Sequence, residues 1–468
     1  MSGRLRNRLQ ARLRSFEVEQ DEQELFDEGD SVLDALEPGR PRRGLLRSGA
    51  IAGGAVLGSN LLNVAFQLST ARLLPPAEYS LLVTLFSVLL ITNVPVLSLQ
   101  ARVARDVANS AQSGKLETAG ALLVDSLRPL ARWGGIVLVA LAIASIPVAL
   151  AVNVERELPF LALAIAVLAT LPLPISWGGL QGLERFPTLA GVQLLYAVLK
   201  LAVGVGLAAA GFGAAAIVLG IAIVTLASFA VSLIPLRSLL AAGARHARGT
   251  MKLLDAYTVR AAAVLALIAA LTNLDLIASR VFLSEHEAGL YAAAGVATRA
   301  LLLLPTIATT VLFPRVATLR ERSAERDHLL GGLVAVTLLG IVPVILFLAI
   351  PEPLLELGFG SDYTGAASYM GSLGVAMMIY ALVEVYAFHF LALGRLSYAM
   401  ILAAGFALQV VLFALLHSSP QDLIWVQIIT ATALLVLSEA YDRSHRRAGR
   451  AAGTSTEPPA EPQPEAAS

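Results

Sequence analysis

Apolar residues occur in long runs along almost the whole chain, and short stretches with Pro, Gly or charged residues separate them. A helix needs about 20 mainly apolar residues to cross the hydrocarbon core of a bilayer. The runs have this length, so the pattern predicts twelve transmembrane helices. Their approximate ranges are 48–73, 79–101, 130–152, 158–180, 188–210, 213–236, 258–283, 289–314, 328–350, 366–391, 397–416 and 422–442.

The positions of the charged residues support this number and orient the helices. Lys and Arg concentrate on the cytoplasmic side of short loops. With the N terminus inside, almost all of the 34 Lys and Arg residues fall in inner segments, and only Arg72, Arg156 and Arg280 fall in outer ones. Lys200 and Arg299 fall within predicted helices. We therefore expect a multi-pass protein of the cytoplasmic membrane with both termini in the cytoplasm.

The composition excludes several classes of protein. The chain is 57% hydrophobic and 15% charged, whereas a soluble domain carries roughly 25% charged residues. The chain has no Cys, which excludes disulfides and thiolate sites. No two His residues have the spacing of metal ligands, so we expect neither a metal nor another cofactor. We also expect no nucleic-acid partner.

Polar segments flank the predicted helices. Arg4, Arg8 and Arg12 recur every four residues within the arm 1–46, as in a short basic amphipathic helix. A solvated tail is the alternative. An acidic stretch follows, and no apolar run precedes a small-residue cleavage site, so a cleaved signal peptide is not expected. The tail 444–468 is rich in Pro and Glu and is expected to be disordered.

An internal repeat divides the apolar part. The segment that starts at Ala71 has a counterpart that starts at Ser279. The matching positions are Arg72 with Arg280, Tyr79 with Tyr291, and Pro95 with Pro305. Repeats of this kind build many transporters. The sequence therefore predicts two six-helix lobes, 47–243 and 244–443, related by a pseudo-two-fold axis along the membrane normal, with a cavity between them. Chance similarity of two apolar segments is the alternative.

Several segments also resemble a known family. They are ARLLPPAEYSLL from Ala71, the stretch 271–319 with its Phe-Pro-Arg, and the stretch 351–395 with its Phe-Gly-x-x-Tyr. Together they resemble the polysaccharide-transport, Wzx-type branch of the multidrug/oligosaccharidyl-lipid/polysaccharide (MOP) exporter superfamily, over residues 48–442. The resemblance implies an all-α, MATE-like membrane fold. It also implies a flippase that moves polyprenyl-diphosphate-linked oligosaccharide from the inner to the outer leaflet.

The resemblance also bears on partners. It implies a lipid-linked oligosaccharide substrate, contact with membrane lipids, and cooperation with a polysaccharide polymerase and glycosyltransferases. Lipid II flippases are expected to have fourteen helices, so the predicted twelve argue against a role with peptidoglycan precursors.

Cationic side chains within the predicted helices are candidates to bind the diphosphate. Ionisable residues inside a membrane are expensive and tend to face a cavity or a partner. Lys200 and Arg299 are the cations nearest to the middle of predicted helices. The alternative is that each pairs with a carboxylate, Arg299 with Asp275 or Lys200 with Glu384. Asp275 and Glu384 could instead couple transport to an ion gradient, since burial moves a carboxylate toward neutrality.

Polar residues at helical spacing extend the candidate substrate site. Gln193, Tyr196 and Lys200 share one helix face, and Asn60, Asn63 and Gln67 share another. Such side chains could bind sugar hydroxyls, or they could join helices within the membrane. Arg72 and Arg280, at outer helix ends, complete the candidate set.

Functions of other classes fit less well. A multidrug or cation antiporter of the same superfamily is the main alternative, with acidic residues carrying its site. A membrane enzyme would need a sizeable external loop, and no Walker motif or nucleophile elbow occurs. A scaffold that uses the acidic arm is a further alternative. We therefore expect a transporter and not an enzyme.

Overall fold

A computed structural model describes residues 42–128, 158–247, 256–305 and 322–454. All regular elements in these ranges are helices, and nine of the helices there are long and apolar enough to cross a membrane. The prediction of an all-α membrane protein is thereby confirmed. The predicted helix 130–152 and most of both terminal arms lie outside the described residues. The chain divides into Met1–Gly53 and a main unit, Gly54–Ser468, and all contacts below lie within the main unit.

The first half of the described chain contains the helices before residue 248. They are α2 (Arg42–Leu73), α3 (Pro76–Gln112), a helix over 116–128, α5 (Leu158–Thr170), α6 (Leu173–Gly182), α7 (Phe186–Ala209), α8 (Ala214–Leu233), η1 (Ile234–Leu236) and α9 (Arg237–Ala244). Proline lies in the first turn of several of these helices. Pro76 occupies the first turn of α3, and Pro174 the first turn of α6, where the missing N–H group costs no hydrogen bond.

The second half contains the helices after residue 255. They are α10 (Ala256–Phe282), α11 (Glu285–Thr298), η2 (Arg299–Leu303), α13 (Arg322–Ala349), α14 (Pro351–Gly358), η3 (Ser361–Ala366), α15 (Ala367–Ala392), α16 (Tyr398–Leu415) and α17 (Pro420–Thr454). A capping box starts α11: Glu287 N donates to Ser284 Oγ at 3.3 Å, and Ser284 N donates to a Glu287 carboxylate oxygen at 3.2 Å. These two bonds satisfy backbone donors that a helix start leaves free.

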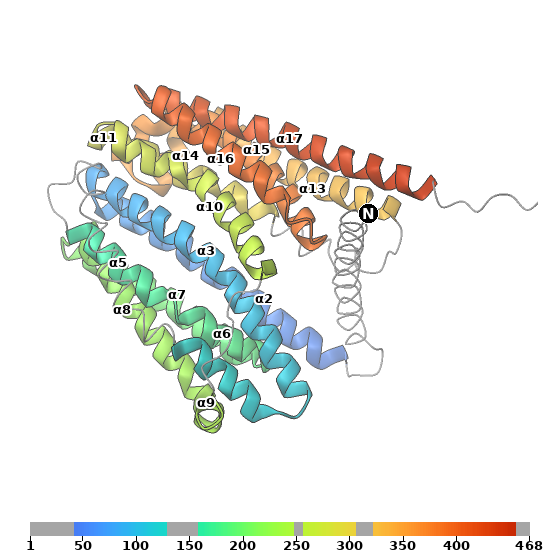
Figure 1. Cartoon of the computed structure of the whole chain (residues 1–468). Helices are drawn as coiled ribbons and strands as arrows, with labels where there is room; N and C mark the ends of the chain where they lie inside the picture. The colour runs from blue at the N-terminus through green and yellow to red at the C-terminus, as the bar shows by residue number, and fades with distance from the viewer. Residues whose placement is uncertain (1–41, 129–157, 248–255, 306–321, 455–468) are drawn as a thin grey trace, which may run out of the picture. The chain divides into compact units, whose positions relative to one another are not determined.

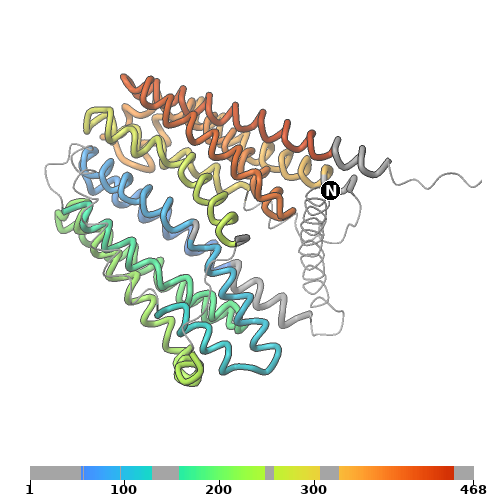
Figure 2. The backbone as a smooth tube through the Cα atoms, in the orientation of Figure 1, coloured from blue at the N-terminus to red at the C-terminus, as the bar shows by residue number. Residues whose placement is uncertain are grey.

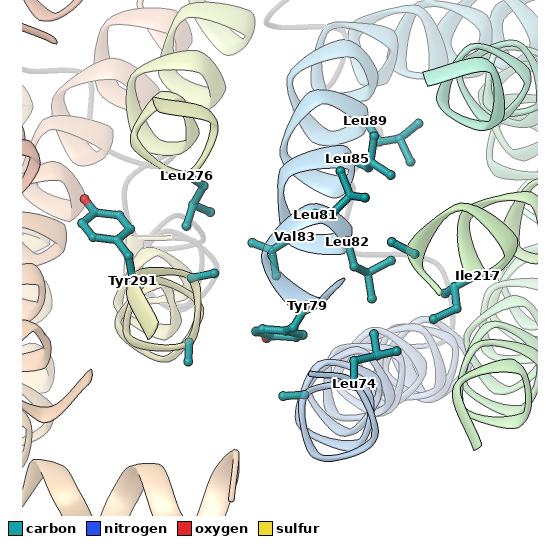
Figure 3. Close-up of a cluster of buried hydrophobic side chains, with 14 of the residues drawn as sticks. Leu74, Tyr79, Leu81, Leu82, Val83, Leu85, Leu89, Ile217, Leu276 and Tyr291 are labelled. Atoms are coloured by element: carbon teal, nitrogen blue, oxygen red, sulfur yellow. The ribbon is translucent and has the colours of Figure 1, made fainter. Parts of the chain in front are cut away.

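Helix α3 is the central element of the packing. It lies along α10 and also contacts α5, α6, α8 and α11 (Figures 1 and 2). Figure 3 shows Val83 on the side of α3 that faces Leu276, and Leu82 on the side that faces Ile217 of α8. One apolar core therefore runs through helices of both halves.

The apolar side chains that point away from this core suit a lipid environment. Helix α13 exposes Leu338 and Ile345, and α7 exposes Val198. Lipid tails are as apolar as these side chains, so a membrane helix need not bury them against protein. These exposed faces agree with the prediction of a membrane protein.

Candidate functional site

The ammonium group of Lys200 lies among uncharged partners. Its Nζ donates to Asn63 Oδ1 of α2 at 2.8 Å. The same nitrogen lies 4.9 Å from the ring centroid of Phe66 and 5.0 Å from that of Phe86. No Asp or Glu of the described ranges forms an ion pair with it, so the alternative pairing with Glu384 is not formed. Lys200 therefore has no acidic partner in this part of the chain.

The rest of the predicted polar face around Lys200 is only partly assembled. Tyr196 packs its ring edge to face against Trp177 of α6, with centroids 6.2 Å apart. Gln67 has a buried side-chain oxygen with no hydrogen-bond partner among the described residues. Asn60 is exposed and Gln193 half-buried. Of the predicted set, Asn63 and Lys200 are thus in direct contact.

The two phenylalanines beside Lys200 were missing from the sequence-based site. Phe66 follows Asn63 by three residues and therefore lies on the same side of α2, which is a signal that could have found it. Phe86 belongs to α3, and nothing in the sequence indicates that it meets α7. The contact of α2, α3 and α7 around one ammonium group is a tertiary feature.

Arg299 is fully engaged with the protein. Its Nη2 lies 2.5 Å from Asp275 Oδ1, and its Nε and Nη2 also donate to the carbonyl oxygen of Thr272, at 3.0 and 2.8 Å. Its Nη1 donates to the carbonyl oxygen of Gly295 at 2.8 Å. Asp275 is 0% exposed, and its other carboxylate oxygen accepts from Tyr291 at 3.1 Å. The pairing of Arg299 with Asp275, one of the two sequence-based alternatives, is formed.

A second set of buried polar groups adjoins α10. Gln409 of α16 donates to the carbonyl oxygen of Leu271 at 3.0 Å, to the Tyr380 hydroxyl at 3.3 Å and to Gln427 Oε1 of α17 at 2.8 Å. Both glutamines are fully buried. Sequence reasoning missed them, although an amide in an otherwise apolar helix is a visible signal. These bonds join α10, α15, α16 and α17 inside the membrane.

The two carboxylates considered for ion coupling differ in their surroundings. Both oxygens of Asp275 accept hydrogen bonds from Arg299 and Tyr291. Glu384 of α15 is also buried, but no described residue forms a hydrogen bond or ion pair with its carboxylate. The described ranges contain no group of three His, Cys, Asp or Glu that could hold a metal ion.

Arg72 and Arg280 both bond to groups of the protein. Arg72 donates from Nε to the carbonyl oxygen of Gly358 at 3.1 Å and from Nη2 to that of Leu357. These carbonyls end α14, where the helix dipole favours a cation. Arg280 donates to Ser80 Oγ at 3.3 Å and to Glu285 Oε1 at 2.7 Å.

The turn between α2 and α3 packs against the segment 357–363, and we call this contact the turn junction. The Tyr363 hydroxyl donates to the carbonyl oxygen of Leu74 at 3.1 Å. The ring of Tyr79 packs edge to face against those of Tyr363 and Phe359, with centroids 5.6 and 6.2 Å apart. The contact therefore joins the first half of the chain to the second.

Comparisons with known proteins agree with this description. The profile of a family described as "Polysaccharide biosynthesis protein" matches residues 70–368. No curated protein matches the chain at a significant level.

Solved structures with the same fold include transporters and a flippase. An inward-facing multidrug resistance MATE family transporter of the MOP superfamily matches with a TM-score of 0.57 at 14% identity, over 83% of this chain and 95% of its own. The lipid II flippase MurJ, in an inward closed conformation, matches with a TM-score of 0.62 at 11% identity, over 84% and 87%. A MOP superfamily transporter from Pyrococcus furiosus matches with a TM-score of 0.55 at 15% identity, over 87% and 96%. These matches confirm the MATE-like fold.

Proposed function

Because the chain belongs to the polysaccharide biosynthesis protein family, in the polysaccharide-transport branch of the MOP superfamily, we propose that it flips polyprenyl-diphosphate-linked oligosaccharide. The family and the fold identify a multi-pass membrane transporter or flippase and not an enzyme. The proposal adds the substrate, the cytoplasmic membrane as the location, and inward-to-outward movement of the glycan.

The observation that carries the proposal is that Lys200 has no carboxylate partner among the described residues. A diphosphate that leaves water needs positive charge from the protein, because burying an unpaired charge is expensive. Lys200 supplies such a charge, since its described partners are an amide oxygen and two aromatic rings. The charge of Arg299 is already balanced by Asp275. We therefore assign the diphosphate contact to Lys200 and give Arg299 a structural role.

Polar side chains on α2 and α7 suit the sugar part of the substrate. Asn60, Asn63, Gln67, Gln193 and Tyr196 offer amide and hydroxyl groups that hydrogen-bond to sugar hydroxyls. Asn63 and Tyr196 lie on the two helices, α2 and α7, that meet at Lys200. In this proposal, Arg72 and Arg280 hold helix ends together and do not contact substrate.

Glu384 is the candidate for coupling to an ion gradient. Its buried carboxylate has no partner among the described residues, whereas Asp275 has two. A proton bound to Glu384 would remove a buried charge that nothing described compensates. The binding and release of that proton can therefore favour different conformations.

In this proposal, the wider organisation of the transporter is the one that the sequence predicts. Two six-helix lobes, 47–243 and 244–443, rock about a central cavity, and both termini lie in the cytoplasm. The lipid tail of the substrate remains in the bilayer while the glycan crosses. Glycosyltransferases deliver the substrate on the inner side, and a polysaccharide polymerase receives it on the outer side.

The test measures flipping directly. The purified full-length protein is placed in proteoliposomes with a fluorescent polyprenyl-diphosphate oligosaccharide, and a membrane-impermeant quencher reports how much label reaches the outer leaflet. We expect wild type and Lys115→Ala to flip the lipid, because Lys115 is an exposed loop residue. We expect Lys200→Ala to lower the rate at least tenfold, and Lys200→Arg to retain part of it.

One result would contradict the proposed function. If wild type flips none of the polyprenyl-linked glycans offered but exports small cations along a proton or sodium gradient, the proposal is wrong. The antiporter alternative would then replace it.

A further inference from the structure

The two phenylalanine rings beside Lys200 do more than fill space. We propose that Phe66 and Phe86 are positioning residues that hold the Lys200 ammonium at the point where an anionic headgroup binds. We also propose that Gly204 is required because it makes room for the Phe66 ring. This inference rests on the proposed function and identifies the residues that prepare its anion contact.

The chemistry of the rings explains why they suit this role. The face of an aromatic ring carries partial negative charge and attracts a cation within about 6 Å of the centroid. Both centroids lie within this distance of Lys200 Nζ, at 4.9 and 5.0 Å. A carboxylate in the same place would neutralise the ammonium and compete with a phosphate. The rings stabilise the charge without neutralising it, so it remains available to an anion.

The rings are held in a fixed arrangement. Phe66 is 1% exposed, and the two rings pack edge to face at 76° with centroids 5.5 Å apart. Asn63, one turn before Phe66 on α2, accepts the hydrogen bond from Nζ at 2.8 Å. The ammonium is therefore oriented by one hydrogen bond and two ring faces. Orientation in advance of binding reduces the entropy that binding would otherwise cost.

Gly204 lies one turn beyond Lys200 on α7 and contacts the Phe66 ring. A Cβ atom at position 204 would lie 2.3 Å from Phe66 Cε2, closer than any normal contact. Gly206, two residues further along the same helix, has open space where its Cβ would be. Gly204→Ala must therefore displace the ring, while Gly206→Ala makes the same chemical change in the same helix without a clash. The two variants form a matched pair.

The small number of lysines allows the position of the ammonium to be observed. The chain contains only Lys115, Lys200 and Lys252. Protein labelled with carbon-13 at lysine Cε therefore gives three methylene signals, and Lys200→Arg identifies one of them. Aromatic ring currents should move the Lys200 signal upfield of the other two. Binding of farnesyl diphosphate, a short polyprenyl diphosphate, is measured on the same full-length protein in nanodiscs.

We expect the upfield shift in wild type and in Gly206→Ala, and its loss or reduction in Gly204→Ala. We also expect Gly204→Ala to weaken farnesyl diphosphate binding by about threefold to tenfold, the range that corresponds to the loss of one or two cation–π contacts. Lys200→Arg should retain part of the affinity. If Gly204→Ala does not fold, Phe86→Leu tests the same role, because it removes one of the two rings beside Lys200. The matched control is Phe413→Leu, which removes a buried ring in the other half of the chain.

Three different results would overturn the inference. A Lys200 signal without an upfield shift in wild type, or equal affinities for Gly204→Ala and Gly206→Ala, contradicts the positioning role but leaves the proposed function intact. A wild-type protein that shows the shift but binds no diphosphate contradicts the proposed function, and with it the role of the rings in anion binding.

Discussion

The buried pair of Arg299 and Asp275 yields the most quantitative prediction. Asp275→Asn removes the carboxylate and leaves the guanidinium facing a neutral amide in a region where Asp275 is 0% exposed. Removing one partner of a buried ion pair costs about 3 to 5 kcal/mol, because the other charge remains buried without compensation. Arg299 keeps its bonds to the carbonyl oxygens of Thr272 and Gly295. We therefore expect a loss at the lower end, about 3 kcal/mol.

Replacing both partners should cost much less than the sum of the single losses. Arg299→Met alone leaves the carboxylate of Asp275 with only the Tyr291 hydroxyl as a described partner, and should also cost about 3 kcal/mol. The double variant contains no buried charge at this place. We expect its loss to be smaller than the sum of the two by about 3 kcal/mol, and so no larger than either single loss; this difference is the interaction energy of the pair.

The assay is a double-mutant cycle on the purified protein. Reversible unfolding in mixed micelles gives the free energy of unfolding of wild type, both single variants and the double variant. The flipping rate of the double variant is measured in proteoliposomes, and we expect it to remain within about threefold of wild type, a change of less than about 1 kcal/mol in the barrier. Single losses that simply add would refute the reasoning about the pair. A double variant that is stable but does not flip would refute the structural role of Arg299.

Three further predictions concern other parts of the molecule. Glu384→Gln should make the flipping rate independent of an imposed pH gradient that accelerates wild type, since the amide cannot take up a proton. If the gradient still accelerates flipping by the variant, Glu384 is not the coupling group. Arg326→Ala should lower the free energy of unfolding by about 2 kcal/mol, because Arg326 bonds two carboxylates at 2.9 Å. Arg443→Ala should lower it by less than about 1 kcal/mol, because the Arg443 ion pair is exposed. Equal losses of the two variants in chemical unfolding would contradict this ranking. Tyr363→Phe keeps the ring but removes a buried hydrogen bond, so thermal unfolding should show a loss of about 1 kcal/mol, and an unchanged melting temperature would show that the bond contributes nothing.

Within the described residues, each of the nine helices apolar enough to cross a membrane overlaps a predicted range, but the apolar pattern predicted the helix ends poorly. The predicted range 397–416 corresponds to α16, Tyr398–Leu415. Helix α3, predicted to end near 101, continues to Gln112. Hydropathy indicates where a chain leaves the bilayer and not where its helix ends. The polar end of α3 remains helical, and an ion pair between Arg102 and Asp106, one turn apart, supports it. The predicted range 158–180 forms two helices, α5 ending at Thr170 and α6 starting at Leu173, with Pro172 and Pro174 at the break. A proline does not always break a helix, because Pro343 lies inside the continuous helix α13.

The candidate site could likewise be predicted only in part from the sequence. Helical periodicity places Tyr196 and Lys200 on one face of α7 because both belong to one helix. It cannot show that Asn63 and Phe86, from two other helices, meet the same ammonium, because such contacts depend on how the helices pack. The pairing of Arg299 with Asp275 was one of two alternatives, and the sequence alone offered no distance by which to choose between them.

The turn junction has a consequence for the order in which the protein is assembled. Arg72 and the backbone of Leu74 find their partners 286 and 289 residues later in the chain. Ribosomes add roughly 5 to 20 residues per second, so this turn waits about 15 to 60 s before α14 and η3 exist. During that interval the polar groups of the turn lack these protein partners. In a nascent chain that stops before α14, this turn has none of the partners that α14 and η3 provide, whichever helices have already entered the membrane.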